Sequence, residues 1–600
     1  MTENISNPLK KIGRPYHDLN EPFTVDENGA KAEFIIQSAE NLPDLTLGAN
    51  VVIKDKRDEK IIFIAGRIVG LKAVSPFNPS REGLLYFEDE EADPTTLLED
   101  VTGHHTHQPM IVVVHLDKEM EIMEETLTDY VSLPVQRPPS AMCKMYFPDL
   151  VVSQRAENDK TPTLQHILEI KENGVGLGMI GFGNTPYYDS TNNEFLPYKL
   201  DLNNLENKHI FVVGESGSGK TVFLKNLAYE IRNYDKDYRI IMTDVQGDIV
   251  QLVLHEITDK ITAKNWQEKV NYKSSEEIFN VIGKFQVLIP VPDGPLSPNL
   301  IALQALLEKY KIDYHFVGLR LQDLSHPSDV EYLFRVTSEQ VGLLLDEEAE
   351  TLLQRRQPVT IDNLKSAIQN ITSRNQNAWI PSSGGTTYSR LTYGAALRAL
   401  ETLKEYFDFH QESMTRDRNP LDYLNFNGTT IIYLDELDDD QKIMWEMQLV
   451  KWLNAHKHDD WKAFVFFDEA HQIIPAKAPD AGAMGTFNRL RASFENLSRI
   501  GRKFGINLVL GTQNPRDLHP IVQEQCSTKV IMKINPSNAG LVHLEPQLAM
   551  IANKFSRGQF WIQSPFNGTP NWVRVHSTAP PIPHESMVTF WKKIQAEATK

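Results

Sequence analysis

The sequence predicts an α/β protein with a parallel sheet, an N-terminal β-barrel and a largely helical insertion. From about residue 200, strand-like runs such as "HIFVVG", "YRIIMTD" and "INLVLGTQ" alternate with helical segments, which is typical of a parallel sheet with crossover helices. Before that point, short strand-like runs are separated by turn residues. Between "FQVLIPV" and "TTIIYLDE", helical periodicity continues without a clear strand.

These patterns set the predicted domain boundaries. The runs "AEFIIQSA", "ANVVIKD", "KIIFIAGRIVGLKA" and "PMIVVVHL" indicate the β-barrel, which we place in residues 1–165. A connector follows over residues 166–200, and the α/β core occupies residues 201–577 with the insertion at about 297–428. We expect residues 578–600 to form a proline-bounded arm and one helix.

Composition restricts the classes of function. The net charge is −19, so the protein as a whole repels nucleic acid, and any contact with DNA needs a local basic lining such as a pore. The two cysteines, Cys143 and Cys526, lie far apart and fit a reducing cytoplasm. No apolar run approaches the roughly 18 residues that span a bilayer. We therefore expect a cytoplasmic protein without a membrane partner.

A phosphate-binding motif follows the strand-like run "HIFVV". Residues 214–221, "GESGSGKT", match the pattern G-x4-G-K-[ST], and the next residues, "VFLKNLAYEIRN", have helical spacing. Glycines let backbone N–H groups approach phosphate oxygens, while the lysine adds a charge and the threonine hydroxyl reaches Mg²⁺. The predicted ATP-binding residues are Gly214, Glu215, Ser216, Gly217, Ser218, Gly219, Lys220 and Thr221.

Two strand-like runs end in an Asp-Glu pair. The pair Asp468–Glu469 follows the apolar run "FVFF", as expected of a buried central strand, and we assign Asp468 to Mg²⁺ and Glu469 to the attacking water. The pair Asp435–Glu436 precedes a helical segment, so we interpret it as capping or interface residues. Asp244, at the end of "YRIIMTD", is a candidate for supporting the site from behind.

A family resemblance rests on several of these motifs together. The segments "YKLDLNNLENKHIFVVGESGSGKT", "FVFFDEAHQIIP" and "LSRIGRKFGINLVLGTQNP" resemble the HerA branch of the HerA/FtsK hexameric P-loop translocases. The upstream "LGANVVIKD" and "IIFIAGRIVGLKA" are similar to the N-terminal barrel of HerA proteins. The resemblance implies a RecA-like fold for the core.

The resemblance also implies a function. Family members form homohexameric rings with ATP and Mg²⁺ between subunits and translocate duplex DNA through the pore, usually beside a partner nuclease. Bacterial relatives also assemble with effectors, including sirtuin-like subunits, in antiphage defence. By motif, Gln513 senses the γ-phosphate, and Arg502 is the arginine finger that reaches a neighbour's ATP, with Arg499 as the alternate.

The sequence departs from the family pattern at two places. Asn514 stands where the family often has arginine, which puts the role of that arginine in doubt. Glu215 occupies a loop position commonly held by a small residue, and we expect its side chain to point away from phosphate. A second hypothesis stays open: the acidic composition favours an ATP-gated assembly hub that organises and activates an effector enzyme without processive translocation.

Two weaker patterns have ordinary interpretations. "GLGMIG", residues 176–181, fits a dinucleotide fingerprint, but turn residues rather than a helix follow it, so we predict a glycine-bearing strand or turn. His104, His105 and His107 lack a cysteine or acidic partner at zinc spacing, so we predict a surface loop.

Overall fold

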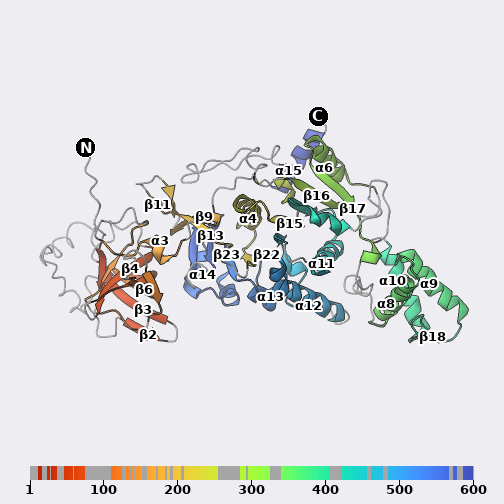
Figure 1. The fold of residues 1–600 in the computed structure, drawn as a ribbon, viewed down its shortest axis with the longest axis horizontal. Helices are drawn as coiled ribbons and strands as arrows, with labels where there is room; N and C mark the ends of the chain where they lie inside the picture. Colours follow the sequence, from red (N-terminus) through yellow and green to blue (C-terminus); the bar gives the residue numbers. More distant parts are fainter. Residues whose placement is uncertain are drawn as a thin grey trace. The chain divides into compact units, whose positions relative to one another are not determined.

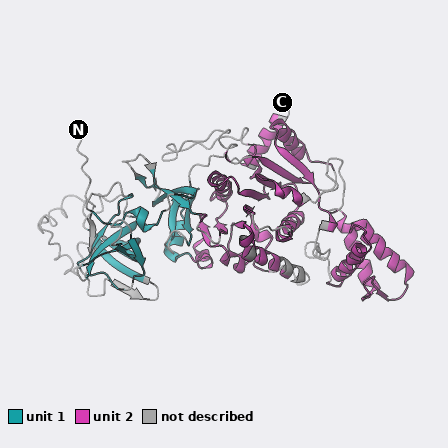
Figure 2. Ribbon diagram, in the orientation of Figure 1, with its two compact units in different colours: residues 1–201, 544–578 teal, residues 202–543, 579–600 magenta. Residues whose placement is uncertain are grey.

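The structure is a computed structural model that describes residues 11–598 with gaps. The longer gaps are residues 16–22, 37–45, 74–109, 124–129, 152–158, 190–193, 204–207, 255–280, 324–338, 408–419, 456–460, 478–483, 566–571 and 578–585, with several shorter ones. The chain divides into two compact units, one of residues 1–201 and 544–578 and the other of residues 202–543 and 579–600 (Figure 2). The predicted His104, His105 and His107 loop lies outside the described residues.

The first unit begins with an antiparallel sheet of eight strands. Their order is β2 (Phe23–Asp26), β3 (Gly29–Ile36), β1 (Lys11–Pro15), β8 (Lys144–Tyr146), β4 (Asn50–Arg57), β5 (Lys60–Ala73), β6 (Met110–Ile122) and β7 (Tyr130–Leu133). β3 also pairs with β6, so six of these strands follow one another in a closed circuit of antiparallel pairs. The short strands that the sequence predicts here are therefore present.

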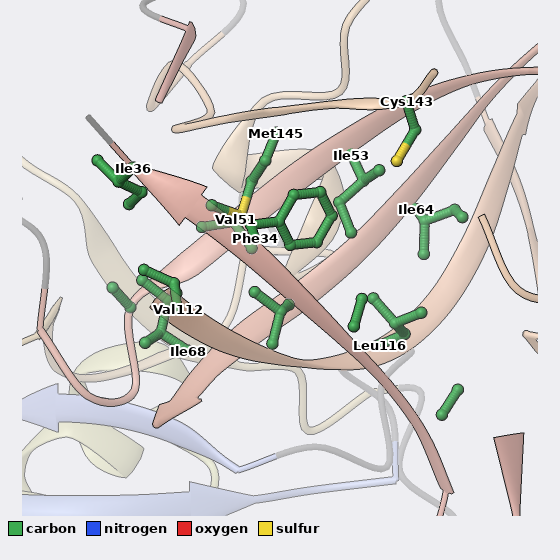
Figure 3. Packing of buried hydrophobic residues seen from close by; sticks show 14 of the residues in the cluster. Phe34, Ile36, Val51, Ile53, Ile64, Ile68, Val112, Leu116, Cys143 and Met145 are labelled. Carbon is green, nitrogen blue, oxygen red and sulfur yellow. The ribbon is translucent and has the colours of Figure 1, made fainter. Parts of the chain in front are cut away.

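Apolar side chains from these strands form one core. Phe34, Ile53, Val112, Leu116 and Met145 come from four different strands and are all buried, and their side chains point toward one another (Figure 3). Burial of a side chain of this size stabilises a fold by roughly 1.5–3 kcal/mol, so this cluster accounts for much of the cohesion of the sheet.

A second group of strands in the first unit joins distant parts of the chain. β9 (Val175–Phe182) pairs with β10 (Thr185–Pro186), with β13 (Pro197–Leu200) and with β25 (Val573–His576). β25 in turn pairs with β24 (Gln559–Gln563). The predicted α/β core extended to residue 577, but the structure groups residues 544–578 with the N-terminal unit, because β25 bonds to β9.

The glycine-rich "GLGMIG" lies within β9, as the interpretation of a glycine-bearing strand predicts. Gly178 has a φ of +151°, and a Cβ atom there would lie 2.3 Å from the carbonyl oxygen of His576 on β25. The glycine therefore permits the close pairing of β9 with β25.

The second unit contains the predicted parallel sheet (Figure 1). Its strand order is β23 (Thr528–Ile531), β14 (Ile210–Val213), β22 (Ile506–Thr512), β21 (Ala463–Phe467), β15 (Arg239–Asp244), β20 (Thr429–Tyr433), β16 (Phe285–Pro290) and β17 (Asp313–Val317). Every residue of β14, β20, β21 and β22 is buried, which explains why these strands are apolar throughout.

The insertion is largely helical, but its predicted boundaries need correction. β17 lies inside residues 297–428 and pairs with β16 in the parallel sheet, although the sequence indicated no strand there. After β17, the helices α8 (Glu339–Gln354), α9 (Ile361–Arg374) and α10 (Arg390–Leu403) contact one another. A small hairpin, β18 (Trp379–Pro381) with β19 (Thr387–Ser389), connects α9 to α10.

The predicted C-terminal helix is α15 (Met587–Ala598), which packs on α6 (Pro298–Lys309). Phe590 and Ile594 are fully buried, and Lys309 Nζ lies 2.7 Å from Glu597 Oε1. None of the helices in the described ranges combines the length and the apolar character that a membrane span requires.

Candidate nucleotide-binding site

The predicted site residues follow three adjacent strands of the parallel sheet. β22 lies between β14 and β21, and the register places Val213 of β14 beside Thr512 of β22. Parallel strands end at the same edge of a sheet. The phosphate-binding loop after β14 (the P-loop, residues 214–221), the pair Asp468–Glu469 after β21 and Gln513 after β22 therefore come together. The topology therefore brings together residues about 250 positions apart.

The P-loop backbone needs its glycines. A Cβ atom on Gly214 would lie 2.5 Å from Ser218 Oγ and 2.9 Å from Met532 Cβ. Gly217 and Gly219 have φ angles of +79° and +98°, which disfavour residues with a side chain. The loop closes through a 3.0 Å bond from the Ser218 N–H to the Glu215 carbonyl oxygen. These conformations leave room for phosphate next to the backbone.

The loop leads directly into a long helix. α4 (Lys220–Tyr234) begins at Lys220, with Gly219 as its N-cap residue and no side chain capping the first turn. The N–H groups and the dipole of this helix end therefore favour an anion in the loop.

Lys220 lies at the centre of the site. Its Nζ donates to Asp468 Oδ1 and, at 2.8 Å, to Glu469 Oε1. Burial alone would lower the pKa of Lys220, but the charges of Asp468 and Glu469 outweigh burial and raise it. Lys220 is therefore a buried cation held by two carboxylates.

The residues around Asp468 fit Mg²⁺. Thr221 Oγ1 donates to Asp468 Oδ2 at 3.2 Å, so a hydroxyl and a carboxylate meet at the start of α4. Both are hard oxygen donors, which Mg²⁺ prefers. Within the described ranges, no group of three or more His, Cys, Asp or Glu side chains could hold a metal. A Mg²⁺ ion at Thr221 and Asp468 therefore needs oxygens from the nucleotide phosphates and water.

Glu469 has an unusual backbone conformation. Its φ of +65° lies in the left-handed region, which strains a residue with a side chain and turns the chain sharply after β21. Gln513 Nε2 donates to Glu469 Oε1 at 2.7 Å. Glu469 Oε2 is buried and accepts no hydrogen bond within the described residues. A carboxylate that is held through Oε1, while Oε2 makes no hydrogen bond among the described residues, is suited to orient a water molecule.

Of the two predicted finger arginines, the structure describes the side chain of Arg499 alone. Arg499 is exposed in the last turn of α12 (Met484–Ile500). Arg502 belongs to the short helix Gly501–Phe504, and its side chain lies outside the described residues. The role of either arginine therefore stays a prediction.

A buried histidine, His209, supports the site, although no sequence pattern marks it beyond its place before β14. The side chain is fully buried, and its Nε2 lies 2.7 Å from the carbonyl oxygen of Ser498 in α12. The Leu508 N–H of β22 donates to its Nδ1 at 2.9 Å. His209 thus ties the arginine-bearing end of α12 to the strands that carry the P-loop and Gln513.

The other acidic pair does not reach Lys220. Asp435 Oδ2 accepts a 3.4 Å bond from the Tyr433 hydroxyl, and Glu436 Oε1 accepts one of 3.4 Å from Asn299. The capping role predicted for this pair is wrong, because the N-cap of α11 (Asp439–Ala455) is Asp438, whose Oδ1 accepts from the N–H of Gln441 at 2.8 Å. The interpretation as interface residues stays a prediction.

Two buried acids lie behind the cluster. Asp244 Oδ2 accepts a 2.7 Å bond from the Val250 N–H, and burial raises the pKa of Asp244 to about 7. Glu446 on α11 accepts a 2.8 Å bond from Thr243 Oγ1, and burial raises its pKa to about 8. Sequence reasoning missed Glu446, because α11 shows no feature that separates it from exposed glutamates.

Two family models match the stretches of the chain that carry the site residues. Residues 183–450 match the family model described as the central domain of the helicase HerA, and this stretch includes the complete P-loop. The chain carries a HerA-type P-loop ATPase domain. Residues 395–536 also match the zonular occludens toxin family, a range that contains Asp468, Glu469 and Gln513.

Curated relatives resemble this chain over part of its length. It is 22% identical over 367 residues to a probable DNA double-strand break repair helicase HerA of Methanocaldococcus jannaschii, which covers 56% of this chain and 63% of the relative. A probable helicase of the same organism is 26% identical over 149 residues, or 23% of this chain and 27% of the relative. The chain thus spans less than two thirds of either relative.

Solved structures resemble this chain weakly. VirB4 of Thermoanaerobacter pseudethanolicus gives a TM-score of 0.42 at 13% identity, over 69% of this chain and 97% of that one. The bacterial conjugative coupling protein TrwBdeltaN70 gives 0.41 at 13%, over 70% and 92%. The order of the parallel strands, together with the phosphate-binding loop between β14 and α4, defines the α/β P-loop fold of the second unit.

Proposed function

We propose that this protein hydrolyses ATP with Mg²⁺ and uses the energy to translocate duplex DNA through a homohexameric ring. The observation that carries the proposal is the convergence of Lys220, Asp468, Glu469 and Gln513 at one edge of the sheet. Hydrolysis needs a cation for the phosphates, a carboxylate for the metal and a carboxylate for the water, and this cluster contains all three.

Each residue has a distinct proposed role. The P-loop N–H groups and Lys220 bind the phosphates, and Lys220 leaves its two carboxylate partners to do so. Thr221 and Asp468 hold Mg²⁺, which neutralises charge on the phosphate oxygens. Glu469 orients and polarises the attacking water, and Gln513, bonded to Glu469, responds to the γ-phosphate. Release of Glu469 from Lys220 when ATP arrives makes its carboxylate available to water.

A further positive charge near the transferred phosphoryl group is proposed to come from a neighbouring subunit. The described residues around Lys220 include no arginine, while Arg499 is exposed on the surface of α12. An arginine supplied across a subunit interface stabilises the charge that develops on the transferred phosphoryl group. We propose Arg502 for this role, with Arg499 as the alternate.

Subunit mixing tests the arginine assignment. Arg502→Ala and Glu469→Gln each abolish hydrolysis in a uniform ring, but a mixed ring contains some sites with an intact Glu469 and an intact neighbouring arginine. We expect mixtures to recover part of the ATPase rate. If no mixing ratio restores hydrolysis, Arg502 does not act across the interface, and the same experiment with Arg499→Ala becomes decisive.

Translocation of DNA is supported by the HerA central-domain match and by the helicase names of the curated relatives. In this proposal the protein is cytoplasmic and acts with a partner nuclease or a sirtuin-like effector, in antiphage defence. The test is displacement of a third strand from a triplex placed on a long duplex. We expect displacement that needs ATP and that Lys220→Ala abolishes. Hydrolysis without displacement on any duplex would contradict translocation.

The net charge of −19 favours one alternative, an ATP-gated hub that organises and activates an effector enzyme. A hub needs no affinity for the phosphate backbone. The ATPase rate at low salt, where contacts to DNA phosphates are strongest, separates the two functions. Stimulation by duplex DNA supports the translocase, whereas stimulation only by the effector protein supports the hub.

A further inference from the structure

The turns after β21 and β22 are bonded to each other. The Ala476 N–H donates to the Asp517 carbonyl oxygen at 2.7 Å, and the His519 N–H donates to the Ile474 carbonyl oxygen at 3.1 Å. The turn after β21 carries Asp468 and Glu469, and the turn after β22 begins with Gln513. A movement of either turn is therefore transmitted to the other.

The imidazole of His471 lies between these turns. Its Nδ1 is 3.4 Å from Glu469 Oε2 and also 3.4 Å from Thr512 Oγ1. Glu469 Oε2 is the buried oxygen that accepts no hydrogen bond within the described residues, and the His471 side chain is 31% exposed. At 3.4 Å both contacts are long for hydrogen bonds, so neither acceptor holds the ring at the usual distance.

Both contacts require the same tautomer of the imidazole. A carboxylate oxygen can only accept a hydrogen bond. Thr512 Oγ1 donates its own proton to the Asn514 carbonyl oxygen at 3.2 Å, so toward His471 it also accepts. Nδ1 must therefore carry the proton in either contact, and one N–H serves two acceptors.

We propose that His471 is a positioning residue for Glu469. Its Nδ1–H donates alternately to Thr512 Oγ1 and to Glu469 Oε2. It thereby sets the direction of the carboxylate that orients water. Thr512 directly precedes Gln513, whose Nε2 holds the other oxygen, Oε1, at 2.7 Å. His471 thus couples the position of the sensor glutamine to the position of the catalytic carboxylate. The inference rests on the proposed role of Glu469.

Two substitutions at this position separate hydrogen bonding from mere packing. His471→Ala removes the donor, and we expect kcat to fall about tenfold while KM for ATP changes less than about threefold. His471→Asn keeps an N–H donor on the atom attached to Cγ, where Nδ1 is attached, and should recover most of kcat. The matched control is His315→Ala, a partly exposed histidine on β17 that stacks on Tyr423, and it should leave kcat unchanged.

A double-mutant cycle tests the link to β22. Thr512→Val preserves the shape of a fully buried side chain and removes only the hydroxyl. If His471 bridges the two turns, the loss in His471→Ala/Thr512→Val is smaller than the product of the single losses. Multiplicative losses would overturn the bridge, since they indicate independent effects.

The outcomes distinguish this inference from the proposed function. Hydrolysis at the unmodified rate in Glu469→Gln would remove the proposed role of Glu469 itself. If Glu469→Gln is inactive but His471→Ala retains full kcat, only the inference about His471 fails. The same holds if His471→Asn is as slow as His471→Ala while both keep the unmodified unfolding midpoint.

Discussion

Lys220 Nζ lies 2.8 Å from Glu469 Oε1, although 249 positions separate the two residues in the chain. Asp468 accepts a hydrogen bond from the same ammonium group, and all three side chains are buried. The cation thus neutralises two carboxylates that otherwise stand close together away from water. This relationship gives Lys220 a structural role in addition to its proposed role toward phosphate.

Lys220→Met should destabilise the nucleotide-free protein. Removal of one partner from a buried ion pair leaves an uncompensated charge and costs roughly 3–5 kcal/mol. Urea unfolding without nucleotide measures this loss. The double variant Lys220→Met/Glu469→Gln carries one carboxylate fewer and should regain part of the stability. Equal stability of Lys220→Met and the unmodified protein would show that the cation does not stabilise the pair.

Glu446→Gln should change how stability depends on pH. Burial raises the pKa of Glu446 from 4.5 to about 8, so between these values the folded protein keeps a proton that the unfolded chain releases. The unfolded state binds fewer protons at Glu446 there, so the contribution of Glu446 to the stability of the folded protein falls as pH rises from about 4.5 to 8. Glutamine stays neutral and keeps an oxygen that can accept from Thr243.

The measurement for Glu446 is the unfolding midpoint at pH 5 and at pH 8. We expect Glu446→Gln to match the unmodified protein at pH 5 and to unfold at a higher temperature at pH 8. If Glu446→Gln instead unfolds at a lower temperature than the unmodified protein at pH 8, the carboxylate is ionised in the folded state and stabilises it.

Gly214→Ala should weaken ATP binding by about tenfold or more. Its Cβ would lie 2.5 Å from Ser218 Oγ and 2.9 Å from Met532 Cβ, so the P-loop must shift to accept it. Titration with a fluorescent ATP analogue measures the affinity. Gly540→Ala is the matched control, because a Cβ there meets nothing within 4 Å. Unchanged affinity in Gly214→Ala would mean that the loop rearranges without cost.

Gly505→Ala should be among the most damaging single substitutions to the fold. A Cβ there would lie 1.2 Å from the Trp461 carbonyl oxygen, and the φ angle is +71°. Gly385 has a φ of +96° but open space, so Gly385→Ala measures the cost of the left-handed conformation alone, about 1–2 kcal/mol. Thermal unfolding should show a far larger loss for Gly505→Ala. Similar losses in the two variants would refute the clash.

The sequence predicted the centre of the site because its motifs follow apolar strands. β14, β21 and β22 are buried throughout, and the polar residues at their ends are the ones that meet. β17 escaped prediction because it is the last strand in the sheet order and only its final residues are buried. An edge strand of this kind lacks the continuous apolar run that marks a central strand.

Local sequence patterns also could not predict which distant segments of the chain contact each other. The pairing of β25 with β9 joins residues about 400 positions apart, and no local signal announces which strand will be the neighbour. The same applies to His209, whose role depends on Ser498 and Leu508 meeting it in the fold.

Single-turnover hydrolysis of radiolabelled ATP by Glu469→Gln measures whether Glu469 activates the attacking water. We expect this variant to bind ATP with Mg²⁺ as the unmodified protein does and to retain it uncleaved, because glutamine cannot polarise the attacking water. Release of phosphate by Glu469→Gln at the unmodified rate would show that Glu469 does not have this role.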